Sequence, residues 1–210
     1  MKKLLSITLC LIMLLSLASC GNKDDNASSN NNSSESSIVS EASNMETPSS
    51  VSADTPGEQT ASVAAIADAV KAAYAESYIP SMSYSKEEIS EKFGLTEDMY
   101  DDIIAEGPMI SVHVDTFIAV HAKPNKTADV ETALNNYRQS LIDNLMQYPM
   151  NQIKIQASVV ESMGDYVFFI MLGEIPTSIE EQGEEETLKY AQQENQIAID
   201  TIKSVLTGSN

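Results

Sequence analysis

Apolar residues recur at helical spacing in two stretches that follow residue 60. The first stretch predicts a helix that Thr60 or Ser62 can cap and that Pro80 ends, because proline cannot continue a helix. The second begins with Ser85–Glu88, which has the form of a capping box, and Gly94 is expected to stop it. Residues 95–105 are acidic and show no clear period, so we interpret them as helix or turn.

Two longer helices are predicted in the second half of the chain. Thr127 is expected to cap the first, and Tyr148-Pro149 is expected to stop it. The inward stripe of this helix consists of Val130, Leu134, Tyr137, Leu141 and Leu145. The second covers residues 184–206, where three glutamates at the start complement the helix dipole. We interpret residues 173–183 before it as a loop.

Three segments show the pattern of strands. Residues 109–123 alternate between apolar and polar positions, which predicts one half-buried strand, or two strands with a bend near Asp115-Thr116. Residues 153–161 alternate in the same way, whereas residues 166–172 are apolar at every position, as in a central strand. The turn-forming residues 162–165 lie between the last two segments, so a hairpin is expected there.

The order of these elements predicts the fold class. Helices and strands do not alternate regularly, and two strands form a hairpin, so the pattern favours an α+β fold. We expect a small, mostly antiparallel sheet with helices packed on one face. This single domain is expected to cover residues 61–207.

The first 20 residues have the features of an export signal with a lipid anchor. Two lysines precede an uncharged apolar run over residues 4–17, which is too short to span a membrane, so residues 1–19 are interpreted as a signal peptide. Small residues lead to Cys20, and this arrangement resembles the lipobox of bacterial lipoproteins. The resemblance implies cleavage between Ser19 and Cys20 and a diacylglycerol on the cysteine sulfur, which suffices for stable anchoring.

Residues 20–60 are expected to be a disordered tether behind this anchor. They are rich in Ser, Asn, Thr, Asp and Glu, with few apolar residues and no period. About 40 flexible residues reach roughly 35 Å. Such a tether would hold the domain away from the membrane.

Charge and cysteine content narrow the possible functions. The formal net charge is −19, and it becomes −21 without residues 1–19, which carry two lysines and no acid. So much negative charge argues against nucleic acid as a partner, and it suits a cationic partner or simple solubility. The chain has two cysteines, Cys10 in the leader and Cys20 at the anchor, so the domain has no thiol for a disulfide.

The candidate chemistry in the domain is sparse. His113, Asp115 and His121 share odd positions on one extended run and are weak candidates for a metal site, because His113 and His121 lie roughly 26 Å apart on a straight strand. Acidic clusters at 97–102 and 180–186 lack the ligand spacing of a calcium loop. The domain contains no nucleophile signature or phosphate-binding loop. We therefore predict no catalytic residue and no cofactor.

Several segments of the domain resemble one known family. The segment at 107–120, Tyr137-Arg138, Tyr148-Pro149 and the Gly-Asp-Tyr-Val-Phe run at 164–168 are similar to the domain of unknown function 4358. The resemblance extends from about residue 62 to 206. It implies a lipoprotein of a Gram-positive bacterium and carries over no activity.

The sequence thus predicts a lipoprotein on the extracytoplasmic face of the cell membrane, held there by lipid on Cys20. The leading hypothesis is a non-enzymatic binding or interaction domain of the cell envelope, with an envelope protein or ligand as its partner. The alternatives are an enzyme or enzyme accessory acting on the cell wall, and a small solute-binding lipoprotein.

Overall fold

The computed structural model describes residues 61–144 and 146–208. The predicted signal peptide, the predicted lipid anchor at Cys20 and the predicted tether fall outside these residues, as does Leu145 of the predicted inward stripe. All described residues lie in one unit, Ala53–Asn210.

Five antiparallel strands form a single sheet in the order β1-β2-β3-β5-β4. The strands are β1 (Met82–Ser83), β2 (Tyr100–Gly107), β3 (Thr116–Ala122), β4 (Val159–Met163) and β5 (Tyr166–Met171). The central strands β3 and β5 are buried at nearly every position, because helices cover both of their faces. The predicted α+β class and antiparallel sheet are confirmed.

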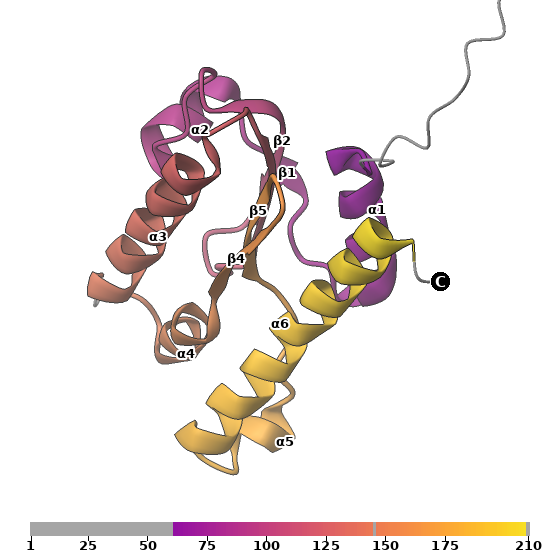
Figure 1. Cartoon of the computed structure of the whole chain (residues 1–210). Coiled ribbons are helices and arrows are strands. Elements are labelled where there is room, and N and C mark those ends of the chain that lie inside the picture. The colour runs from indigo at the N-terminus through magenta and orange to yellow at the C-terminus, as the bar shows by residue number, and fades with distance from the viewer. Residues whose placement is uncertain (1–60, 145, 209–210) are drawn as a thin grey trace, which may run out of the picture. The chain divides into compact units, whose positions relative to one another are not determined.

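Six α-helices surround this sheet (Figure 1). They are α1 (Val63–Tyr74), α2 (Lys86–Phe93), α3 (Thr127–Asp143), α4 (Pro149–Ala157), α5 (Thr177–Glu180) and α6 (Glu184–Thr207), with a short 3-10 helix, η1 (Ala75–Ser77), after α1. Figure 1 shows α1 and α6 on one side of the sheet and α2, α3 and α4 on the other.

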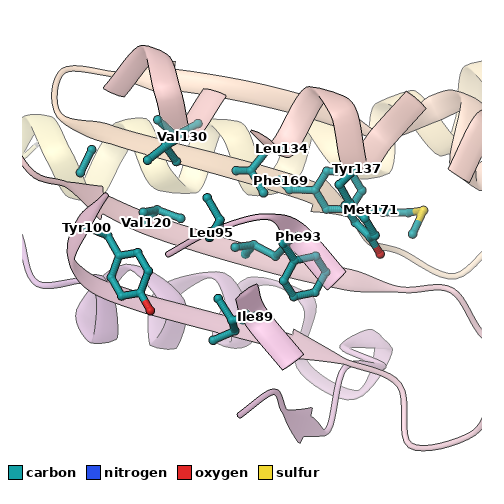
Figure 2. Close-up of a cluster of buried hydrophobic side chains, with 14 of the residues drawn as sticks. Ile89, Phe93, Leu95, Tyr100, Val120, Val130, Leu134, Tyr137, Phe169 and Met171 are labelled. Carbon is teal, nitrogen blue, oxygen red and sulfur yellow. The ribbon is translucent and has the colours of Figure 1, made fainter. Parts of the chain in front are cut away.

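The helices pack on both faces of the sheet, so the expectation of a single covered face was wrong. Alternate residues of β3 belong to different apolar clusters, with Phe117 and Ala119 in one and Ile118 and Val120 in the other. The first cluster joins the sheet to α1 and α6. The second joins it to α2, α3 and α4, and Figure 2 shows Phe93, Val120 and Phe169 within it. A strand buried on both faces needs apolar residues at consecutive positions, as β3 has.

Several local predictions are confirmed. The side chain of Ser62 accepts a hydrogen bond from the amide of Ala65, so it caps α1. Both hydrogen bonds of the capping box between Ser85 and Glu88 are present at the start of α2, and Gly94 ends this helix in the left-handed conformation. The hairpin of β4 and β5 is also present.

Other elements differ from the predictions. Residues 100–107 form strand β2 instead of helix or turn, because pairing with β1 and β3 satisfies their backbone groups. The strand expected over 109–123 begins only at Thr116, and residues 108–115 form a loop. Residues 149–157 form helix α4, so Pro149 begins a helix as well as following α3, a position that suits proline.

Candidate interaction surface

The structure does not bring the three weak metal-site candidates together. His113 is exposed in the loop before β3, whereas Asp115 is buried at the end of that loop. His121 lies at the far end of β3, roughly 20 Å along the strand from Asp115. There its ring stacks on Tyr166, with 4.7 Å between ring centroids. Among the residues that the structure describes, no group of three or more His, Cys, Asp or Glu side chains can hold a metal ion.

Asp115 instead forms a buried ion pair with Lys154 of α4. The Lys154 Nζ atom lies 2.5 Å from Asp115 Oδ1, and the two side chains are 9% and 1% exposed. The pair connects the loop before β3 to the middle of α4. Sequence reasoning considered Asp115 for a metal site and did not identify Lys154 as its partner, because nothing in the local pattern indicates a contact across 39 residues.

Hydrogen bonds do not fully compensate the desolvation cost of burying this ion pair. The second carboxylate oxygen of Asp115, Oδ2, is buried and has no hydrogen-bond partner within the described residues. Burial raises the pKa of Asp115 above its ordinary value, and the nearby charge of Lys154 opposes this effect only in part. A buried pair of this kind contributes little net stability, but removal of one partner leaves an unpaired charge inside the protein.

Two further polar contacts fix the loop before β3. The side-chain amide of Asn151, in the first turn of α4, donates a hydrogen bond of 3.0 Å to the carbonyl of Val112. The hydroxyl of Thr116 donates one of 2.9 Å to the carbonyl of Val114. Asn151 is itself buried. The loop is therefore held by buried polar groups and not by an apolar core of its own.

Three apolar side chains of this loop are exposed, whereas Val114 packs against the apolar cluster beside α2, α3 and α4. Met109 is 74% exposed, Ile110 62% and Val112 49%. The sequence pattern had placed Ile110 and Val112 on a buried strand face, and this was wrong because the segment pairs with no neighbouring strand. Within the described residues, no other element covers these three side chains, so packing inside the domain does not explain their apolar character.

Neighbouring segments extend the exposed apolar area. Met146 is 93% exposed and Tyr148 is 65% exposed, directly before the turn of α4 that contacts Val112. Met82, 39% exposed, lies on β1, where it pairs with Gly107, the last residue of β2 before the same loop. These six side chains define what we call the apolar surface: Met82, Met109, Ile110, Val112, Met146 and Tyr148. They are all but one of the large exposed apolar residues in the described part of the chain, the other being Ile197.

This apolar surface also differs from the rest of the domain in charge. Residues 61–208 carry 24 acidic and nine basic side chains, a net charge of −15. Yet no Asp, Glu, Lys or Arg occurs in residues 77–85, 107–114 or 144–153, the three segments that supply the six apolar side chains. The absence of charge from these segments was a signal available in the sequence, but only the fold shows that they are neighbours.

A groove between α2 and α3 is the second feature of interest. Its volume is about 530 Å³, and Phe93, Met99 and Tyr137 contribute to its apolar lining. The only acid along it is Asp129, which pairs with Lys126 at 2.9 Å. The groove lining therefore contains neither a pair of carboxylates nor a carboxylate with a histidine, two common arrangements for acid–base catalysis.

Some residues of the two acidic clusters at 97–102 and 180–186 have structural roles. Glu97 forms an ion pair with Lys86, and the hydroxyl of Thr96 donates a 2.5 Å hydrogen bond to Asp98. Glu184, Glu185 and Glu186 occupy the first turn of α6, where they complement the positive end of the helix dipole. None of these acids is buried.

Comparison with known proteins identifies one family. Residues 73–172, from the end of α1 to the residue after β5, match the family described as Domain of unknown function (DUF4358). The match is shorter than the resemblance over residues 62–206 that the sequence indicated. No curated protein and no solved structure matches the chain. The described helices include none that is long and apolar enough to cross a membrane.

Proposed function

We propose that residues 73–172, which match the DUF4358 family, form the main part of a binding domain, and that the chain is a lipoprotein on the extracytoplasmic face of the cell membrane. In this proposal Cys20 carries the lipid, residues 20–60 are the tether, and the domain binds another protein of the cell envelope without catalysing a reaction. The organism would be a Gram-positive bacterium.

One observation carries the binding role: the apolar surface is exposed and is built from three segments without charged residues in an otherwise strongly acidic domain. Its six side chains expose on the order of several hundred Å², the size of patch that commonly marks an interaction site on a monomer. Three of the six are methionines, whose flexible side chains adapt to the shape of a partner.

The buried contacts beneath this surface support the same role. A loop that served only to connect β2 and β3 would not need a buried ion pair or a buried amide to hold its position. Burial of Asp115 and Lys154 carries a desolvation cost of several kcal/mol per ion before pairing. The contacts hold the loop at Val112, Val114 and Asp115, which lowers the cost of ordering this part of the loop when a partner binds.

Small-solute binding is a second candidate, favoured by the groove between α2 and α3. Its volume of about 530 Å³ lies within the range of roughly 300–1,000 Å³ that is typical of ligand sites. It is weaker than the first candidate because the described residues that line the groove include no buried polar side chain free to orient a ligand.

Photo-crosslinking in living cells tests the proposed function. A photoreactive amino acid replaces Met146, the most exposed side chain of the apolar surface. We expect a discrete crosslinked product with an envelope protein, and we expect Ile110→Ser to remove it. Ile197→Ser is the matched control, because Ile197 is also a large, exposed apolar residue but lies on α6, outside the apolar surface.

The controls separate specific binding from chance contact. A crosslinked product that persists in the Ile110→Ser variant, or that disappears equally in Ile197→Ser, would contradict the proposal. The absence of any product from position 146 would do the same. Circular dichroism spectra of both variants should match that of the unmodified protein, because both residues are exposed.

A further inference from the structure

We infer that the partner presents a positively charged amphipathic segment to the apolar surface. This inference rests on the proposed function and adds the chemistry of the partner. Its basis is the contrast between the uncharged centre of the binding site and the strongly acidic domain around it.

The cations of the domain are mostly engaged within it. Five of the nine basic side chains form ion pairs: Lys71, Lys86, Lys126, Lys154 and Lys189. The guanidinium of Arg138 donates hydrogen bonds to the backbone carbonyls of Ser158 and Gln156. With 24 acids in the same region, most carboxylates have no basic partner. The field around the domain is therefore negative, and it attracts cations and repels anions.

Acidic residues also stand at the ends of the uncharged segments. Glu76 directly precedes residues 77–85, and Asp143 directly precedes residues 144–153; both are exposed. Neither forms an ion pair with another described residue. The bases that directly follow these two segments, Lys86 and Lys154, form ion pairs with Glu97 and Asp115. Of the charged residues next to these two apolar segments in the sequence, the two acids are therefore unpaired and the two bases are paired, which leaves net negative charge beside the segments.

An amphipathic basic segment matches both parts of this arrangement. Its apolar face can cover the methionines, Ile110 and Val112, while its lysines or arginines meet the acids beside these segments. Complementary charge at the rim increases the association rate and excludes partners of the wrong sign. A second copy of this chain is disfavoured, because two domains of net charge −15 repel each other.

Fluorescence anisotropy with three designed peptides tests the inference. The first peptide is an amphipathic helix of leucine and lysine, the second replaces each lysine by glutamate, and the third has the lysine composition in a scrambled, non-amphipathic order. The protein is the full chain with Cys20→Ser. We expect the first peptide to bind at least about tenfold more tightly than either of the others, and we expect its affinity to fall as NaCl rises from 50 to 500 mM.

Two pairs of variants locate the binding site. Ile110→Ser should weaken binding of the first peptide at least about fivefold, while Ile197→Ser should leave it unchanged. The double variant Glu76→Gln/Asp143→Asn should weaken binding at least about threefold more than Glu184→Gln/Glu185→Gln, which removes the same charge from the start of α6.

Several outcomes would overturn the inference. Equal affinity for the lysine and glutamate peptides, equal effects of the two charge variants, or binding that strengthens with salt would each contradict a basic partner. Self-association that increases with salt in sedimentation would indicate a second copy, and binding to neutral phosphatidylcholine vesicles that Ile110→Ser abolishes would indicate a lipid surface. If the crosslinked product at Met146 is retained in any of these cases, the interaction role stands and only the chemistry of the partner is wrong.

Discussion

The buried pair of Asp115 and Lys154 allows a quantitative prediction about stability. In the variant Lys154→Met, the apolar stem is kept and the ammonium is lost, so Asp115 Oδ1 loses its 2.5 Å partner while Oδ2 already has none. Removal of one partner from a buried ion pair typically costs about 3–5 kcal/mol, because the remaining charge stays buried and unpaired. We expect a loss of about 3 kcal/mol or more in the free energy of unfolding at pH 7.

The loss should depend on pH in a definite direction. Burial raises the pKa of Asp115 in the folded protein, and loss of Lys154 raises this pKa further. A carboxyl whose folded pKa exceeds its unfolded pKa contributes stability below the unfolded pKa and loses it as pH rises through the folded pKa. Lys154→Met should therefore be most destabilised near neutral pH, and the difference from the unmodified protein should shrink as the solution is acidified.

Urea unfolding followed by circular dichroism measures this difference. With a denaturant slope of roughly 2 kcal/mol per M, a loss of about 3 kcal/mol lowers the unfolding midpoint by about 1.5 M. The double variant Asp115→Ala/Lys154→Met should recover part of the loss at pH 7, because it leaves no unpaired charge. A loss under about 1 kcal/mol at pH 7, or a loss that does not decrease on acidification, would refute the reasoning about the buried pair.

Two further predictions concern other parts of the chain. Gly173→Ala should destabilise the domain by several kcal/mol in the same urea assay: the backbone has φ +99°, and an added Cβ would lie 2.4 Å from the Cβ of Glu194. Gly164→Ala, with φ +62° and no neighbour within 4 Å, is its control and should cost less, so equal losses would contradict the steric explanation. Cys20→Ser should release the protein from the membrane fraction into the medium, detectable by immunoblot of fractionated cells, and retention in the membrane fraction would contradict the lipid anchor.

Much of the fold could be predicted from local patterns. The caps at Ser62 and Ser85, the stop at Gly94 and the hairpin of β4 and β5 follow from interactions between residues close in sequence, so their signals are local. Helix α6 was predicted almost to its ends for the same reason, because apolar residues at helical spacing reveal its buried face. These elements sufficed to indicate an α+β domain.

The features that were predicted wrongly share a different physical cause. Strand β2 carries acids at 101, 102 and 106, so its own residues do not favour a strand, and it is stabilised by pairing with β1 and β3. The segment at 109–114 alternates like a strand but finds no pairing partner, so it forms a loop with its apolar residues exposed. Coverage of both sheet faces likewise depends on where the helices pack, which no local pattern specifies.

The sequence by itself determined the composition of the candidate site: three uncharged segments within an acidic chain. Only the tertiary structure decided that these segments are neighbours, because β1 pairs with the end of β2 and Asn151 of α4 binds the carbonyl of Val112. The same is true of Asp115, whose partner Lys154 lies 39 residues away. Such contacts depend on how the whole chain packs, and that packing turns a run of apolar residues into a defined surface.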